Sequence, residues 1–427
     1  MDQIHQGIYL QIDQTDKFKT INFTINFLEP LQKANISKRA LLAAILENSN
    51  NTEKTPDQIA VHLENLYGAN FSLSHYVEGQ TSILSLSAIC PAPQFLPEHE
   101  DVLHALVALI KKNLFEPAQE AGVAAFDQAI FNREQNNLKH KVQAYMDDKQ
   151  YAAALATKSL YFGADNPVAL PTTGRLADIE AISAANLWAY FEQLLVQDQI
   201  VITVTGDVAA LDIKRIFDWP ELSPRPKQTE LPLFYQQPLA PEVNQGQQQL
   251  PVTQGKLNLM YQVPVTYYGP QYFDYLVANT VFGGSAQSML FMNVREKLSL
   301  AYYANSNLDA FTGTVMVQTG IDSDKKDIVL SEIKNQLAHI QAGEVSDILI
   351  ANAKKLLIDQ FAQRSDSPFG RNLRYLFQFL QPAVVMDTPA FATAVNGVTK
   401  AAIQAAAANF KLQTIYAIEK RYEDATD

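Results

Sequence analysis

The feature that most limits the fold of this chain is an internal repeat, because the order of strand-like and helix-like patterns in its first half returns in its second. Residues 63–87, LENLYGANFSLSHYVEGQTSILSLS, match residues 294–318, VREKLSLAYYANSNLDAFTGTVMVQ, as a helix end followed by two alternating segments. Residues 179–195 and 395–410 match as a helix N-cap followed by an amphipathic helix. The repeat predicts two copies of one α+β unit of about 210 residues; chance similarity between amphipathic segments is the alternative.

A proline-rich interval separates the two copies. Residues 219–251 contain seven of the chain's twenty prolines and a run of glutamines. Because proline lacks a backbone donor and fixes φ, we expect an extended linker here. We therefore predict an N-terminal domain over 1–218 and a C-terminal domain over 252–427. Each is expected to be an α/β sandwich, a mostly antiparallel sheet packed with helices, which places the chain in the α+β class.

Local patterns indicate several elements of the first copy. Alternating residues on both sides of a turn-like DQTD predict a β-hairpin over 7–28, and a similar pattern predicts two antiparallel strands over 70–88. Ser37 is expected to cap a helix that is apolar nearly all round and therefore buried. Thr55 and Gln58 are spaced as a capping box at the start of the next helix.

Composition excludes several classes of function. The formal net charge of −12 opposes binding to phosphate backbones and anionic membrane surfaces. The only cysteine, Cys90, lies in an apolar run, which excludes an intramolecular disulfide and favours a reducing cytoplasm. The N-terminus has neither a basic segment nor an apolar core, and no window approaches eighteen uninterrupted apolar residues. We expect a cytoplasmic protein that contacts neither nucleic acid nor membrane.

The seven histidines do not form a local zinc motif. His99 and His104 are five positions apart, so that on a straight helix they would point about 140° away from each other. His75 begins a sequence like the inverted motif H-x-x-E-H, but Gly79 stands where its second histidine would be. The chain also lacks the glycine-rich phosphate loops and the G-x-S-x-G nucleophile elbow. The sequence therefore predicts no metal site and no nucleophile.

The segment FGGSAQSMLFMNVREKLSLAY, residues 282–302, resembles a pattern of the C-terminal domain of the pitrilysin or insulinase-type (M16) metallopeptidases. That pattern reads roughly F-G-G-G-x-x-S-R-L-F-x-x-V-R-E-K-x-G-L-A-Y, and Arg295 and Tyr302 occupy its arginine and tyrosine. Departures from it are serines in place of two glycines, and a methionine in place of an arginine, at Ser285, Ser299 and Met289. ITVTGDV at 202–208 resembles the strand that closes the family's first domain. The resemblance covers nearly the whole chain and implies paired α+β domains that enclose a chamber.

The family's inverted zinc motif is absent where the resemblance would place it. Its ligands should fall near Leu41 to Leu46, in RALLAAILEN, and these positions are aliphatic. The downstream glutamate ligand would fall between 120 and 140, where Glu134 lies. Aliphatic side chains pack without partners in a buried helix, whereas histidines would need them. The resemblance thus implies no zinc in this chain.

Several bacterial members of this family are heterodimers in which one subunit holds zinc and the other supplies the arginine and tyrosine. This sequence resembles the second kind, which implies zinc in a homologous partner subunit and a peptide or unfolded polypeptide as substrate. The FKT near the N-terminus, LENLYGA and YMDDKQYA resemble a Gram-positive group of non-catalytic members associated with the 5-aminopentanol modification of elongation factor P.

Two functions follow from the resemblance. In the first, the chain is inactive alone but supplies a peptidase assembly with Arg295, whose planar fork would hold substrate, and Tyr302, whose hydroxyl would stabilise an oxyanion. Gly283 and Gly284 would form the supporting turn. In the second, the chain is a proteolytically inactive protein that binds a polypeptide or assists assembly. The residue types also fit an ordinary solvated helix face around Arg295, a packed strand residue at Tyr302 and a plain helix-to-helix turn at Gly283 and Gly284.

Overall fold

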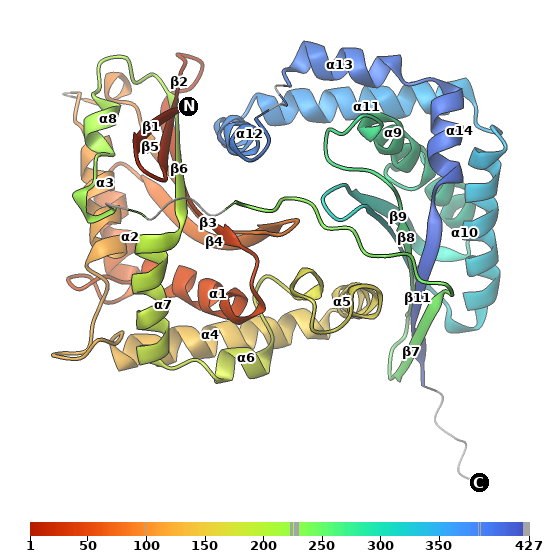
Figure 1. Ribbon diagram of the computed structural model, residues 1–427, viewed down its shortest axis with the longest axis horizontal. Helices are drawn as coiled ribbons and strands as arrows, with labels where there is room; N and C mark the ends of the chain where they lie inside the picture. Colours follow the sequence, from red (N-terminus) through yellow and green to blue (C-terminus); the bar gives the residue numbers. More distant parts are fainter. Residues whose placement is uncertain (98, 223–224, 226–229, 383, 385, 422–427) are drawn as a thin grey trace, which may run out of the picture. The chain divides into compact units, whose positions relative to one another are not determined.

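The computed structural model describes residues 1–97, 99–222, 225, 230–382, 384 and 386–421 (Figure 1). Packing divides these residues into two compact units that do not follow the order of the chain. Unit 1 consists of residues 1–143, 171–233 and 364–385, and unit 2 consists of 144–170, 234–363 and 386–427. Among the described residues, no helix combines the length and the apolar character that crossing a membrane requires.

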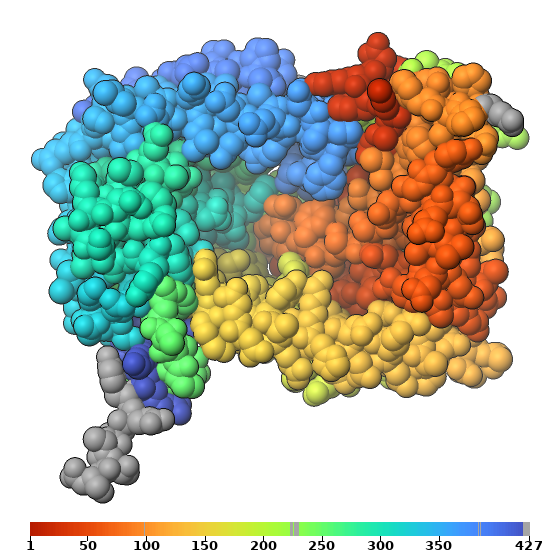
Figure 2. Space-filling view, turned by 180° about the vertical axis from the view of Figure 1, so that it is seen from behind, coloured from red at the N-terminus to blue at the C-terminus, as the bar shows by residue number. Residues whose placement is uncertain are grey.

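Unit 1 is built on a six-stranded sheet with the strand order β1-β2-β6-β3-β5-β4. Its strands are β1 (Asp2–His5), β2 (Ile8–Gln14), β3 (Thr20–Pro30), β4 (Asn70–Glu78), β5 (Thr81–Pro91) and β6 (Gln199–Gly206). Its helices are α1 (Lys33–Asn48), α2 (Pro56–Asn65), α3 (Val102–Phe115), α4 (Gln128–Asp147), α6 (Leu176–Glu180), α7 (Ala184–Gln197), α8 (Ile213–Ile216) and α12 (Pro368–Leu380), with short 3₁₀ turns η1 (Pro93–Phe95) and η3 (Pro220–Leu222). Most side chains of α4 are not buried, and its surface forms an orange-to-yellow band in Figure 2.

Unit 2 is built on a five-stranded sheet with the order β7-β11-β8-β10-β9. Its strands are β7 (Asn244–Leu250), β8 (Gly255–Gln262), β9 (Ala301–Asp309), β10 (Thr314–Ile321) and β11 (Lys411–Lys420). Its helices are α5 (Lys149–Phe162), α9 (Tyr272–Phe282), α10 (Lys326–Gln341), α11 (Asp347–Ser365), α13 (Thr388–Gly397) and α14 (Lys400–Ala408), with the π-helix η4 (Leu290–Lys297) and the 3₁₀ turns η2 (Pro167–Ala169) and η5 (Ser323–Lys325).

The two sheets have the same topology. The order β2-β6-β3-β5-β4 becomes β7-β11-β8-β10-β9 when each strand is replaced by the one at the same place in the second repeat. The one parallel pair recurs as well, since β2 runs parallel to β6 and β7 runs parallel to β11, while the other pairs are antiparallel. The helix N-caps expected within 179–195 and 395–410 are confirmed: they are Ser183, which accepts from the Asn186 N–H, and Thr399, which accepts from the Ala402 N–H. These features confirm the α+β class and the duplication.

Each unit contains one helix from the other half of the chain. The sheet hairpin β4-β5 is followed by α3, α4 and α5, and the hairpin β9-β10 is followed by α10, α11 and α12. The third helix of each series packs on the sheet of the other unit: α5 contacts β8 and β11, and α12 contacts β3 and β6. Nothing in the sequence pattern indicates this exchange. The predicted domain limits 1–218 and 252–427 describe the two sequence repeats. The compact units are defined by packing, and each combines segments from both halves of the chain, so these limits remain a prediction.

Three local expectations are wrong. The strands β2 and β3 within 7–28 do not form a hairpin, because β6 is inserted between them and pairs with both. Ser37 does not cap a helix, because α1 already begins at Lys33 and buries Ser37. The interval 219–251 is not entirely an extended linker, since β7 pairs with β11; the part of this prediction that falls on 223–224 and 226–229 lies outside the described residues.

Candidate functional site

The Gly283-Gly284 pair forms a tight turn at the end of α9, because both N–H groups donate to the carbonyl of Asn279 at 2.9 Å. At Gly283 the close neighbour is β9, whose Ser306 N–H donates to the Gly283 carbonyl at 2.9 Å. A Cβ on Gly283 would lie only 2.6 Å from that nitrogen, so no larger residue fits without a shift of the backbone. The turn thus fixes where the next helix begins and how closely it packs on the sheet.

Arg295 lies in η4, a helix wound wider than an α-helix. The Leu298 N–H donates to the carbonyl of Asn293, five residues earlier, at 3.1 Å. The guanidinium carbon of Arg295 lies 4.6 Å from the centroid of the Phe291 ring, and its Nε lies 3.6 Å from Glu296 Oε1. The side chain is 41% exposed, so that most of its donors remain accessible to a ligand.

Two further backbone irregularities separate Arg295 from Tyr302. Ser299 has φ of 50°, in the left-handed region that costs an L-residue free energy and that glycine adopts easily. This is one of the two positions where the family pattern has glycine and this chain has serine. In the β9–β10 ladder, Tyr303 pairs with Gly320 and Ala301 pairs with Ile321, which leaves Tyr302 as the extra residue of a β-bulge. The bulge changes the direction in which the Tyr302 side chain points, and this residue is 59% exposed.

The Tyr302 hydroxyl donates to Asp322 Oδ1 at 3.1 Å. The other carboxylate oxygen of Asp322 accepts from Lys325 Nζ at 2.8 Å, three residues further along the chain. Hydrogen bonding to Asp322 and the negative charge of this carboxylate raise the pKa of Tyr302 above its ordinary value. The hydrogen bonds from Lys325 and Tyr302 lower the pKa of Asp322. Near neutral pH the pair therefore consists of a neutral phenol and an ionised carboxylate. Sequence reasoning missed Asp322; its only signal was an acidic residue directly after a strand.

Neither Arg295 nor Tyr302 is among the residues that line a cavity beside the π-helix. A cavity of about 410 Å³ between η4 and α10 is lined by Met289, Asn293, Lys297, Leu298, Glu332, Gln336, His339 and Glu344.

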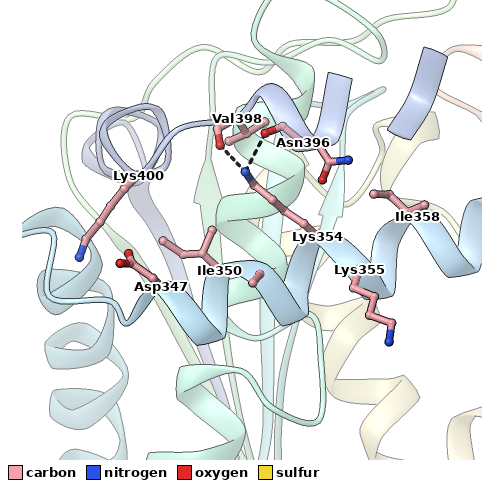
Figure 3. A pocket seen from close by; sticks show the side chains of 9 residues that line it. Asp347, Ile350, Lys354, Lys355, Ile358, Asn396, Val398 and Lys400 are labelled. Atoms are coloured by element: carbon pink, nitrogen blue, oxygen red, sulfur yellow. Dashed lines mark hydrogen bonds between the residues drawn. The ribbon is translucent and has the colours of Figure 1, made fainter. Parts of the chain in front are cut away.

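A second cavity, of about 490 Å³, lies between α11 and the connection from α13 to α14 (Figure 3). There Lys354 Nζ donates to the carbonyls of Asn396 and Val398 at 3.0 and 2.5 Å, so that this ammonium group stabilises the C-terminal end of α13 (Figure 3).

The residues of α1 do not fit zinc. Leu41 and Ile45 are fully buried in the core of unit 1, and aliphatic side chains cannot coordinate a metal ion. Within the residues that the structure describes, no group of three or more histidine, cysteine, aspartate or glutamate side chains is placed to hold a metal. Glu134 is buried but pairs with Arg133 at 2.7 Å. No step of chemistry on a metal can therefore be assigned to this chain.

Sequence reasoning also missed a buried charged cluster beside those aliphatic positions. Arg39 of α1 is fully buried; its Nε donates to Glu29 Oε1 and to the Tyr190 hydroxyl, both at 2.8 Å, and its Nη2 donates to Asp198. Burial raises the pKa of Asp198 to about 6, an effect that the Arg39 guanidinium partly opposes. The cluster joins α1, β3 and α7, and its role is structural, since it satisfies charges inside the core.

Comparisons with known proteins show similarity to peptidase homologues that are described as inactive. The family profile described as "Peptidase M16 inactive domain" matches residues 181–357. The Bacillus subtilis (strain 168) protein described as "Probable inactive metalloprotease YmfF" is 29% identical over 415 residues, which cover 96% of each chain. A second protein of that strain, described as "Uncharacterized zinc protease YmxG", is 22% identical over 238 residues, 54% of this chain and 56% of its own.

A crystal structure of a conserved protein from Enterococcus faecalis V583 is 31% identical, with a TM-score of 0.94 and 99% of each chain covered. The similarity therefore extends over both repeats and includes the exchanged helices within its span. The inactive descriptions agree with the aliphatic residues of α1, which stand where the resemblance places the zinc ligands, and they are consistent with a chain that is inactive by itself. The chain is thus an M16-like homologue of proteins described as inactive: residues 181–357 match the inactive-domain profile of the M16 peptidases, and 96% of the chain aligns with a probable inactive metalloprotease.

Proposed function

We propose that this chain is the non-catalytic subunit of a heterodimeric zinc-peptidase-like assembly. Its own Arg295 and Tyr302 would bind the substrate and stabilise the oxyanion at a zinc site in a homologous partner subunit. The substrate class is a peptide or an unfolded polypeptide, and the location is the cytoplasm, in keeping with the single buried thiol of Cys90.

The observation that carries the proposal is the concentration of irregular backbone around these two residues. Within Leu290–Tyr302 the chain contains a π-helix, a serine in the left-handed region and a β-bulge. Each of these departures costs free energy or regularity, and π-helices and bulges occur frequently at functional sites. An ordinary solvated helix followed by a strand would need none of them.

The chemistry of the two side chains fits the assigned roles. Arg295 is partly exposed and keeps donors for a carbonyl or carboxylate of the substrate, while its contact with Phe291 limits the rotation of the side chain. Tyr302 carries a neutral hydroxyl, and a phenol can donate to an oxyanion. The Gly283-Gly284 turn would be the supporting element, since it sets the start of η4 against β9.

A partner with zinc is supported by what is known of one bacterium. Bacillus subtilis (strain 168) has one relative of this chain that is described as an inactive metalloprotease and one that is described as a zinc protease. An inactive chain that is homologous to a zinc-bearing one is what a heterodimer made by duplication would contain.

The test combines this chain with the zinc-motif-bearing M16 homologue of the same genome. Co-purification, followed by cleavage of a set of internally quenched peptides, should show activity that neither subunit has alone. Tyr302→Phe should lower kcat/KM on the order of 100-fold, the usual effect of removing one oxyanion donor, and Arg295→Ala should also lower it, without loss of assembly. Tyr303→Phe and Lys297→Ala are the matched controls and should leave activity unchanged. Equal activity of Tyr302→Phe and Tyr303→Phe would refute the proposal.

A second candidate function is a proteolytically inactive protein that binds polypeptide or assists assembly in the modification of elongation factor P. It is favoured by the fact that Arg295 and Tyr302 both already have partners on the surface of their own unit, Phe291 and Asp322. Cells lacking the chain would then lose the 5-aminopentanol group from elongation factor P, as measured by intact mass. A double variant, Arg295→Ala with Tyr302→Phe, would restore it as well as the wild type does.

A further inference from the structure

The starting observation is that the Tyr302 hydroxyl has only one proton to donate, and this proton points at Asp322. An oxyanion would require the same proton. Asp322 competes for this proton because it is ionised, and Lys325, which donates to its second oxygen at 2.8 Å, keeps the carboxylate in place. The arrangement in the chain by itself is therefore not the arrangement in which Tyr302 could act on a substrate.

The placement of the two residues follows from the register of the sheet. Ile321 is the last residue of β10 and pairs with Ala301, the first residue of β9. Tyr302, which follows Ala301, is the extra residue of the bulge and has no partner in this ladder. Asp322 is the residue that follows Ile321, so it lies beside the bulge. The short turn η5 then brings Lys325 back to Asp322. The sheet register and the turn that follows it thus bring together Tyr302, the Asp322 carboxylate that accepts from it, and the Lys325 ammonium group that donates to the same carboxylate.

We infer that Asp322 and Lys325 form a latch. Asp322 is a positioning residue that accepts the hydrogen bond of the Tyr302 hydroxyl until an oxygen atom of the substrate replaces Asp322 as the acceptor. The inference rests on the proposed function of Tyr302 and adds a regulatory contact to it. The latch would keep the tyrosine in one orientation without substrate, and binding would have to exchange one acceptor for another. Asp322 would slow the engagement of weak substrates, whose developing charge competes poorly with a carboxylate.

The latch can open without any unfolding. Tyr302 is 59% exposed, and the side chains of Asp322 and Lys325 are 38% and 36% exposed, so water can replace every partner as the hydroxyl turns away. Interactions this exposed are weak and screened by salt. The other charged group of this turn is Asp324, which interacts with Lys325 and gives a matched control for the loss of one negative charge.

The first experiment needs no partner. The chain is labelled with ¹³Cζ-tyrosine, and the signal of Tyr302 among the eighteen tyrosines is assigned from its loss in Tyr302→Phe. In wild type and in Asp324→Ala the Tyr302 phenol should titrate above the ordinary range of tyrosine, whereas in Asp322→Ala its pKa should fall to about 10. The same titration midpoint in wild type and Asp322→Ala would overturn the latch.

The second experiment measures peptide cleavage by the reconstituted pair of subunits. Asp322→Ala should raise kcat/KM for the quenched peptides about two- to fivefold, the size expected for releasing one exposed interaction, and the rise should shrink at high salt. Asp324→Ala should match wild type. Cleavage by Asp322→Ala that is equal to or below wild type would overturn the latch while leaving the proposed function intact. No effect of Tyr302→Phe would instead overturn the proposed function, and the latch would then have no purpose even if the titration shows the hydrogen bond.

Discussion

Arg371 and Asp13 are 358 positions apart in the sequence and form a two-pronged ion pair inside unit 1, with Nε and Nη2 of the arginine donating to the two carboxylate oxygens at 2.5 and 2.8 Å. The pair joins α12 to β2, and beside it the Thr205 hydroxyl donates to the Asn372 side chain at 2.7 Å. Polar contacts therefore anchor the exchanged helix, and the apolar side of the same helix covers Leu28, Ile83 and Val201 of the sheet through Leu376.

Arg371→Met should destabilise the chain by about 2–3 kcal/mol, because it leaves the Asp13 carboxylate, which is only 8% exposed, without its cation. Urea unfolding followed by circular dichroism measures this. Lys17→Met is the matched control, since the Lys17–Asp366 pair also joins the first and the last of the three segments of unit 1 but is exposed, and its loss should change stability by less than about 0.5 kcal/mol. Equal effects of the two variants would contradict the anchoring role of Arg371.

Ser299→Gly should stabilise the chain by about 1 kcal/mol, because glycine adopts a φ of 50° without the steric cost that serine bears. Ser285→Gly is the matched control: Ser285 is the other serine at a glycine position of the family pattern, but its φ is not positive. There the change increases the entropy of the unfolded chain and removes the hydrogen bonds of the Ser285 hydroxyl with Thr280 and Gln287, so the expected result is a loss of stability. Thermal unfolding compares the two variants, and equal shifts in Tm would refute the strain at Ser299.

Gly283→Ala should destabilise unit 2 by about 2–3 kcal/mol, because its Cβ would meet the Ser306 backbone nitrogen at 2.6 Å and the Leu290 side chain at 2.8 Å. Gly397→Ala, at the end of α13, meets no atom within 4 Å and should be neutral or slightly stabilising. Hydrogen exchange of β9 amides distinguishes a local loosening of the turn from global unfolding. A Gly283→Ala variant as stable as wild type would show that the turn adapts freely.

His75 should make stability depend on pH. Its Nδ1 lies 2.8 Å from the carbonyl of Thr172, which can only accept, so the ring is neutral with Nδ1–H as donor and with Nε2 accepting from Ser82. Burial lowers the pKa of His75 to about 4. Between pH 6.5 and about 4 the unfolded chain binds a proton that the folded chain does not, so stability falls as pH falls through this window.

The expected loss of stability from His75 is about 2–3 kcal/mol, and it should be absent above pH 6.5. Urea midpoints measured from pH 7.5 to 4.5 test this. His75→Gln keeps a side-chain donor for Thr172 but does not titrate, so its midpoint should vary less with pH than that of wild type. Parallel pH profiles of the two proteins would exclude His75 as the source.

Patterns that depend on neighbours in sequence could be predicted. The capping box of Thr55 and Gln58 and the antiparallel pair β4 and β5 are both present, because a cap or an alternation is specified within a few residues. The repeat could be predicted for the same reason, since each copy uses the same local signals. The motif around Arg295 and Tyr302 was recognisable because its spacing is local.

Features that depend on distant partners could not be predicted. Alternation shows that β2 and β3 are strands but not that β6 separates them. The polar strand β7 lies in a proline-rich stretch and exists only because β11 offers it an edge. Arg39 interrupts an aliphatic helix, and its burial depends on Glu29 and Asp198, which approach from other elements. The contact of Tyr302 with Asp322 depends in turn on a one-residue bulge, which no sequence periodicity reveals.

The exchange of helices has a consequence for how the protein is made. The last strand of the first sheet ends at Gly206, but the helix that covers part of this sheet ends at Leu380. At the usual speed of a ribosome, about 5–20 residues per second, the time between the synthesis of Gly206 and that of Leu380 is on the order of ten to thirty seconds. Throughout that time Leu28, Ile83 and Val201 of the nascent first half form an apolar surface that Leu376 covers only after α12 has been made.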